Sequence, residues 1–115
     1  TLPAKATSRI GDFIHFDLLG DMTASDVLKI GTSGEFFAIG SKLHVVGEDA
    51  TRVGVIDVSD ATDDFLNITC ATNGDGGIGT NFHCYFNGSN WGINCVVYGV
   101  GAKSAASAAT VFATS

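Results

Sequence analysis

The sequence has few positive charges, a single proline and no long apolar run. Lys and Arg account for 6 of its 115 residues, against 12 Asp and Glu, which gives a net charge of −6. A nucleic-acid binder needs a basic surface that displaces counterions from phosphate groups, so we expect no nucleic-acid partner. A membrane-spanning helix needs about 18 consecutive apolar residues, and because no run approaches that length we expect no membrane partner.

Cysteine is scarce as well, and its number is odd. Cys70, Cys84 and Cys95 all lie in strand-like segments, and an oxidising compartment would leave one of them unpaired. We interpret the three as buried thiols that pack like small hydrophobic side chains, with the alternative that Cys84 and Cys95 face each other across a hairpin. Together with a first residue of Thr, as initiator-Met removal would leave, they favour synthesis in a reducing cytosol.

Hydrophobic residues and turn-forming glycines are abundant. Hydrophobic residues make up 45% of the chain, and 15 residues are glycine. They are arranged as short strand-like runs separated by turn signals about every ten residues. This pattern is typical of β-sandwiches and barrels. We predict one all-β domain, an antiparallel β-sandwich or jelly roll of about seven to nine short strands. Residues 21–30 hold either a strand over 27–30 or one helical turn capped by Ser25. The other expected strands are 12–19, 35–39, 42–46, 51–58, 65–71, 81–86, 91–100 and 111–113.

The clearest local signal is a hairpin over residues 81–100, NFHCYF-NGSN-WGINCVVYGV. Its Asn87-Gly88 pair tolerates the positive φ that tight hairpin turns need. Because side chains alternate between the two faces of a strand, a loop of two or four residues puts one apolar set on a single face. That set is Phe82, Cys84, Phe86, Trp91, Ile93 and Cys95, while His83, Tyr85, Asn94, Val96 and Tyr98 form the opposite face.

The first eleven residues show no periodicity. We divide the chain into an extended N-terminal arm, residues 1–11, and a sandwich domain, residues 12–115. A frayed terminus is the alternative interpretation. As an arm, the segment would become ordered on a partner surface, where Lys5 and Arg9 would meet acidic groups.

No group of residues has the spacing of an active site. His15, His44 and His83 fall on three separate predicted strands, without the short ligand spacings of zinc sites. His83 and Cys84 are neighbours on one strand and therefore point to opposite faces, which argues against a catalytic pair. We expect no enzymatic activity and no cofactor.

Two loops have some likeness to calcium sites. Residues 76–81 are similar to one calcium-binding nonapeptide repeat, but Asn81 replaces its aspartate and such repeats bind calcium only when several are stacked. The acidic turn over residues 57–64 lacks the ligand order of a calcium-binding loop. We interpret the first as a flexible loop and the second as a solvated turn, and we expect no metal site.

Several segments together resemble the small structural proteins that decorate or cement the heads of tailed bacteriophages, which often have a β-sandwich or jelly-roll fold. The resemblance is one of pattern, over about residues 11–101. Its segments are GDFIHFDLL, SDVLKIG, EFFAIGSKLHVV, TRVGVIDVSDATDDFL and CVVYGVGA.

The resemblance implies a non-enzymatic virion protein that is made in the host cytoplasm and binds the outer surface of the capsid. Such proteins commonly form homotrimers and bridge neighbouring subunits of the major capsid protein. On this interpretation the N-terminal arm is the capsid-binding segment. Its candidate contact residues are Thr1, Leu2, Pro3, Lys5 and Arg9.

The rival hypothesis is a carbohydrate-binding or adhesin-type β-sandwich module. It would use Trp91, Tyr85 or Tyr98 as an exposed stacking platform. The alternation of the hairpin places Trp91 in the core and the two tyrosines on the other face. Tyr85 and Tyr98 are therefore the aromatic residues that this hypothesis requires.

Overall fold

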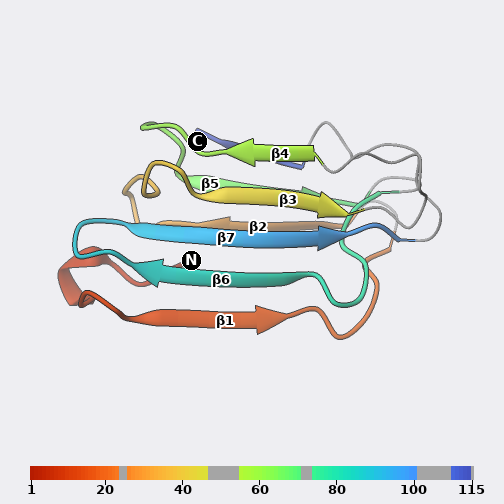
Figure 1. The fold of residues 1–115 in the computed structure, drawn as a ribbon, viewed down its shortest axis with the longest axis horizontal. Coiled ribbons are helices and arrows are strands. Elements are labelled where there is room, and N and C mark those ends of the chain that lie inside the picture. Colours follow the sequence, from red (N-terminus) through yellow and green to blue (C-terminus); the bar gives the residue numbers. More distant parts are fainter. Residues whose placement is uncertain (24–25, 47–54, 71–73, 101–109, 115) are drawn as a thin grey trace.

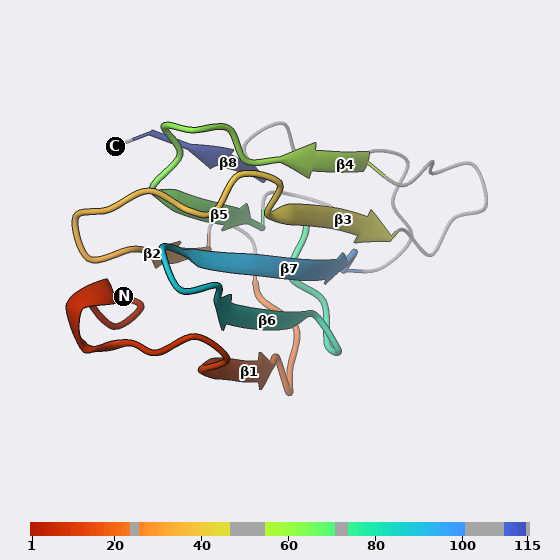
Figure 2. The ribbon, with the colours of Figure 1, turned by 60° about the vertical axis from the view of Figure 1, so that its left-hand side comes forward.

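Two packed β-sheets form the molecule (Figures 1 and 2). The structure, a computed structural model, describes residues 1–23, 26–46, 55–70, 74–100 and 110–114. The described part contains no α-helix, and the predicted all-β sandwich is confirmed. Its elements are the 3₁₀ helix η1 (Lys5–Thr7) and the strands β1 (Phe13–Asp17), β2 (Val27–Gly31), β3 (Lys42–Val46), β4 (Val55–Val58), β5 (Phe65–Thr69), β6 (Asn81–Phe86), β7 (Trp91–Tyr98) and β8 (Val111–Ala113).

The two sheets differ in size. The larger has the strand order β1-β6-β7-β3-β4 and the smaller the order β2-β5-β8. Among the described strand pairs, β3 and β7 are parallel and the others are antiparallel. Alternation along a strand indicates which side chains are buried but carries no information on the direction of the neighbouring strand, so this parallel pair was not predicted.

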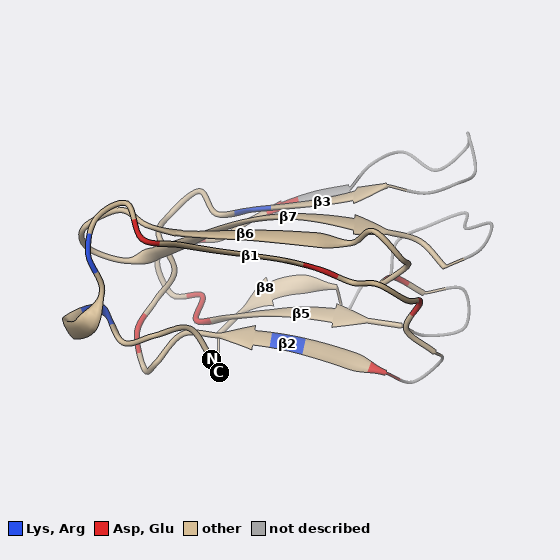
Figure 3. Cartoon of the chain, turned by 90° about the horizontal axis from the view of Figure 1, so that it is seen from below, with Lys and Arg blue, Asp and Glu red and all other residues tan. Residues whose placement is uncertain are grey.

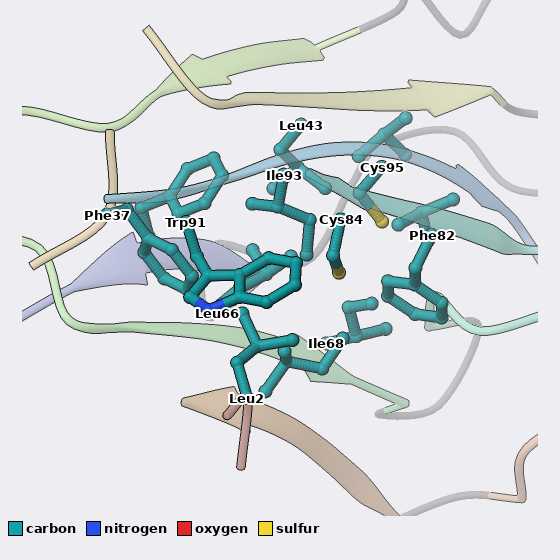
Figure 4. Close-up of a cluster of buried hydrophobic side chains, with 14 of the residues drawn as sticks. Leu2, Phe37, Leu43, Leu66, Ile68, Phe82, Cys84, Trp91, Ile93 and Cys95 are labelled. Carbon is teal, nitrogen blue, oxygen red and sulfur yellow. The ribbon is translucent and has the colours of Figure 1, made fainter. Parts of the chain in front are cut away.

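The β6–β7 hairpin supplies one wall of the core, as its alternation predicts (Figure 4). Phe86 pairs with Trp91 across a four-residue loop, and all six residues of the predicted apolar set are at most 5% exposed. Leu66 and Ile68 of β5 face them from the smaller sheet. Burying one such side chain stabilises the fold by about 1.5–3 kcal/mol.

The hairpin loop is closed by its own side chain and by a glycine. Asn87 Oδ1 accepts hydrogen bonds from the backbone N–H groups of Ser89 and Asn90, both at 2.9 Å. Gly88 has φ of 99°, in the left-handed region that other L-residues disfavour. The Asn-Gly signal therefore marks the turn.

The strand predicted over residues 35–39 is wrong. Phe37 N–H donates to the carbonyl of Asp63, beside β5, and Ala38 N–H donates to the carbonyl of Trp91 in β7. These partners belong to different sheets, because the segment carries the chain from β2 of one sheet to β3 of the other. Its apolar residues cross the sandwich and form no strand.

The other differences concern strand ends and residues that are not described. Residues 27–31 form a strand, β2, and not the alternative helical turn; Ser25, the cap of that turn, lies outside the described residues. Of the strand predicted over 51–58, residues 51–54 also lie outside them, and β4 covers the rest. Several strands begin or end one or two residues inside the predicted bounds, as is usual for such assignments.

The N-terminal segment lies against the open side of the sandwich, between the edge strands β1 and β2. Leu2 enters the core and is 5% exposed; its N–H donates to the carbonyl of Gly31 at 2.8 Å. One residue later, the carbonyl of Pro3 accepts a hydrogen bond from Trp91 Nε1 at 2.9 Å. Part of the predicted arm therefore shares the hydrophobic core of the domain, and Figure 4 shows Leu2 beneath the Trp91 ring.

Candidate interaction surfaces

Of the predicted capsid-binding residues, Lys5 and Arg9 lie at the end of the sandwich that carries the 87–90 loop, where Figure 3 shows them in blue, while Thr1 and Leu2 lie beside β2. Thr1, Pro3, Lys5 and Arg9 are exposed, whereas Leu2 is buried. A side chain from a distant part of the sequence helps to hold the segment: Lys5 N–H donates to the carboxylate of Glu35, 3.4 Å from Oε1 and 3.3 Å from Oε2. The two cationic side chains thus reach solvent at one end of the molecule.

Exposed apolar side chains lie at the same end. Ile10, Phe36 and Ile39 are all exposed, Ile39 by 76%. Phe36 and Ile39 line a hollow of about 360 Å³, and its polar lining includes Lys5, Glu35 and Asn90. Sequence reasoning missed this grouping, because it placed Phe36 and Ile39 in a strand.

We call this surface the basic–apolar end. Its exposed members come from the N-terminal segment and from the 35–39 connection, which the fold brings together. They are Lys5, Arg9, Ile10, Phe36 and Ile39.

A second surface is the outer face of the larger sheet, where four rings form a cluster that we call the ring ladder: Phe13, His15, His83 and Tyr85. The ring centroids of Phe13 and His83 are 6.0 Å apart with 27° between the planes, and those of His83 and Tyr85 are 6.3 Å apart with 25°. His15 lies 6.0 Å from His83. His83 and Tyr85 point outward, as the hairpin alternation predicts, but both are half-buried, whereas Tyr98 on the same face is exposed.

A glycine beneath the ladder lets one ring lie close to the sheet. Tyr85 pairs with Gly92 across β6 and β7. A Cβ atom at Gly92 would lie 2.2 Å from Cζ of Tyr85 and 2.5 Å from its hydroxyl oxygen. The Tyr85 ring therefore covers the Cα of Gly92 and takes the space that any other residue would fill.

The strand register extends the ladder across the sheet. His15 pairs with His83, His83 with Asn94, and Asn94 with Lys42, so four polar side chains form one row over β1, β6, β7 and β3. His15 Nε2 also lies 3.3 Å from Asp17 Oδ1, and both side chains are about half exposed. An ion pair this exposed contributes little stability.

The buried thiols carry no nucleophile. Cys84 and Cys95 are free thiols in the core, and Cys84 pairs with Ile93, so the two cysteines are diagonal and not directly opposed. Desolvation by burial raises the pKa of Cys84 to about 11. Desolvation, with a smaller effect of the nearby Cys84 thiolate, also raises the pKa of Cys95. Both stay protonated near neutral pH, and His83 points to the opposite face.

The acidic turn is closed by hydrogen bonds of its own. Asp60 Oδ1 accepts from the backbone N–H and the hydroxyl of Thr62, and these bonds hold the pKa of Asp60 below its usual value. Asp60 N–H in turn donates to Asp63 Oδ2 at 2.9 Å. Within the described ranges, no group of three or more His, Cys, Asp or Glu residues could hold a metal ion.

The glycine-rich loop is packed against the end of β7. The N–H groups of Gly76 and Gly77 both donate to the carbonyl of Tyr98, at 3.0 and 2.8 Å. A Cβ at Gly77 would lie 2.4 Å from the carbonyl oxygen of Gly99. Close approach of two backbones explains this glycine, without any ligand.

No protein-family model matches the chain, and no curated protein or solved structure is significantly similar to it. The resemblance to phage head-decoration proteins therefore stays a prediction. In the part of the chain that the structure describes, no helix has the length and apolar character required to cross a membrane.

Proposed function

We propose that this protein is a non-enzymatic structural protein that decorates the outer surface of a viral head, where it binds the major capsid protein. The observation that supports the proposal is the basic–apolar end. Cations of the N-terminal segment and apolar side chains of a distant connection converge there on one exposed surface. Exposed apolar groups rimmed by polar residues mark protein interaction sites.

Because the N-terminal segment is docked on the sandwich, only part of the predicted arm can contact a capsid, and attachment would occur through the basic–apolar end (end-on attachment). Leu2 and Pro3 hold the segment on the sandwich through Gly31 and Trp91, so the residues offered to a capsid are Lys5 and Arg9. Their positive charges are complementary to acidic groups on a capsid, and Phe36 and Ile39 supply the apolar contact. In a homotrimer, binding of one subunit to the shell would hold the other two close to their own sites. This raises their effective concentration, so that three weak contacts bind more tightly together than one alone.

Co-sedimentation with expanded heads of the source virus tests the proposal. We expect the double variants Phe36→Ala/Ile39→Ala and Lys5→Glu/Arg9→Glu each to lower the apparent affinity about tenfold or more, as loss of central interface contacts does. Leu19→Ala is the apolar control, because Leu19 is 89% exposed beyond the end of β1, away from this surface. Lys42→Glu on the sheet face is the charge control.

Retention of full head binding by both double variants would contradict end-on attachment. Sedimentation velocity, alone and with heads, tests the trimer separately. A species that is monomeric in solution and isolated on the shell would rule out the trimer while leaving the attachment surface intact.

A further inference from the structure

We propose that the outer face of the larger sheet is a binding site for a neutral saccharide, with the ring ladder as its stacking platform. This activity goes beyond attachment to a head and uses a different surface. The basic–apolar end lies at one end of the sandwich, whereas the ladder lies on the sheet between the two ends (Figure 1).

The charge of the face favours a neutral ligand. Among the described outward-facing residues of the five strands, Asp17 and Lys42 carry formal charges, and they are of opposite sign. The chain as a whole has a net charge of −6. A polyanion such as a nucleic acid finds no basic stripe on this face, while a neutral polyhydroxylated molecule meets no unfavourable field.

The chemistry of the face matches the two sides of a pyranose ring. The ladder offers aromatic surface to the C–H side of a sugar, chiefly from Phe13, which is 68% exposed, because the negative face of an aromatic ring attracts polarised hydrogens. His83, Asn94 and Tyr98 offer hydrogen-bonding groups to the hydroxyls, and no described part of the protein forms a hydrogen bond with these three side chains.

The dimensions of the row suit an extended oligosaccharide. Neighbouring strands of a sheet are about 4.8 Å apart, close to the length of one sugar unit in an extended chain. The His15–His83–Asn94–Lys42 row crosses four strands and offers a side chain at each step. An oligosaccharide lying across the strands would therefore place successive units on successive side chains.

Gly92 indicates that one ring of the platform is held in place. Glycine within a strand costs about 0.5–1 kcal/mol relative to alanine, and Gly92 is the second residue of β7, the central strand of the larger sheet. Its missing side chain is what allows the Tyr85 ring to lie over the backbone. Holding a binding ring in its bound orientation lowers the entropy lost on binding.

Titration of the 115-residue chain with cellohexaose, chitohexaose and mannohexaose, followed by NMR, tests the site, with heparin as an anionic probe. We expect at least one neutral hexasaccharide to shift resonances of the outward residues of β1, β6 and β7. Tyr85→Ala and His83→Ala should each weaken that binding about tenfold, as loss of a stacking partner does. Phe36→Ala, which removes an exposed aromatic ring elsewhere, should leave it unchanged.

Gly92→Ala tests the position of a ring most directly, because it keeps every ring of the ladder but displaces that of Tyr85. We expect a loss of affinity similar to that of Tyr85→Ala, and no further loss in the Gly92→Ala/Tyr85→Ala double variant. The double variant has room for the new methyl group, so it keeps the test valid if Gly92→Ala alone fails to fold. Undiminished affinity in Gly92→Ala would overturn the positioning role of this glycine.

Other outcomes would overturn the site itself. The site is ruled out if no neutral hexasaccharide binds at millimolar concentration, or if heparin is the one probe that binds. It is also ruled out if Phe36→Ala weakens saccharide binding as much as Tyr85→Ala does. Self-association abolished by Phe13→Ala would instead make this face a contact between copies. Head binding by Tyr85→Ala should remain normal, so failure of the saccharide site and failure of the proposed decoration function give different results.

Discussion

The β6–β7 hairpin has two faces that the same alternating sequence assigns to different tasks. Its inner face consists of side chains that are at most 5% exposed and pack on the smaller sheet. Its outer face carries the half-buried rings of His83 and Tyr85, whose centroids are 6.3 Å apart, and the exposed Asn94. Consecutive residues such as His83 and Cys84 point to opposite faces, because side chains alternate along a strand. Cys84 must therefore fit the core, whereas His83 is available for contact with a partner.

The difference predicts how substitutions should behave. A change on the inner face should be felt in the free energy of unfolding, since interiors are close-packed and collapse poorly around a void. A change on the outer face should alter binding and leave the fold intact.

Thiol reactivity should show the strongest contrast between folded and unfolded chain. At about pH 8, iodoacetamide should modify Cys84 and Cys95 at least about 10³-fold more slowly than in concentrated urea, because labelling requires opening of a fold worth about 5 kcal/mol or more. Mass spectrometry of the labelled positions measures the rates. Comparable rates in both conditions would contradict burial of the inner face.

The same thiols should make stability depend on alkaline pH. The pKa of Cys84 rises from about 9 to about 11 on folding. The neutral buried thiol therefore contributes its full stability below about pH 9, and that contribution is lost as the pH rises toward 11, because the unfolded chain loses its proton first. Urea midpoints across this window should fall more for the parent chain than for Cys84→Ala.

Trp91→Ala should lower the free energy of unfolding by about 3–5 kcal/mol, as for other large core aromatics. The substitution removes the indole ring, whose centroid lies 5.6 Å from that of the Phe86 ring, and also its hydrogen bond to the Pro3 carbonyl. Urea denaturation followed by circular dichroism measures the loss. A cost below about 1 kcal/mol would place Trp91 outside the core.

Leu2→Ala should cost about 2 kcal/mol, at the low end for buried leucine, because its pocket opens at the side of the sandwich. Leu19→Ala should change the free energy of unfolding by less than about 0.5 kcal/mol. Trp91 is the single tryptophan of the chain, so its fluorescence reports whether the N-terminal segment remains docked. Equal effects of the two leucine substitutions would contradict the insertion of Leu2.

His83→Ala should cost less than about 1 kcal/mol, the usual range for a cross-strand aromatic pair on a half-exposed face. Urea denaturation alongside Ile93→Ala, a 0% exposed inner-face residue of the same hairpin, gives the direct comparison. A larger loss for His83→Ala than for Ile93→Ala would reverse the contrast between the two faces.

The inner face could be predicted from the sequence because it depends on local rules alone. The Asn87-Gly88 turn sets the loop length, and alternation then assigns every residue of the hairpin to a face. The same rule gave the outward direction of Tyr85 and Tyr98. Nothing beyond the hairpin was needed for these inferences.

The candidate surfaces depend on pairings between distant segments, which local rules do not reach. The ladder needs the register that sets His15 beside His83, and the basic–apolar end needs the 35–39 segment to cross between sheets. The burial of Leu2 had no signal beyond its hydrophobicity, since an aperiodic segment with two cations suggests a solvent-exposed arm. The glycine at 92 carries information only once Tyr85 is known to lie above it.

The parallel pairing of β3 with β7 has a consequence for how the chain acquires this shape. The hydroxyl of Ser41, at the start of β3, accepts a hydrogen bond from Ile93 N–H at a sequence separation of 52 residues. Closing so long a loop costs entropy before any contact is gained, so topologies of this type fold in milliseconds to seconds, not microseconds. During synthesis β3 must wait for β7 to leave the ribosome, and until then its unpaired edge is open to any other strand within reach.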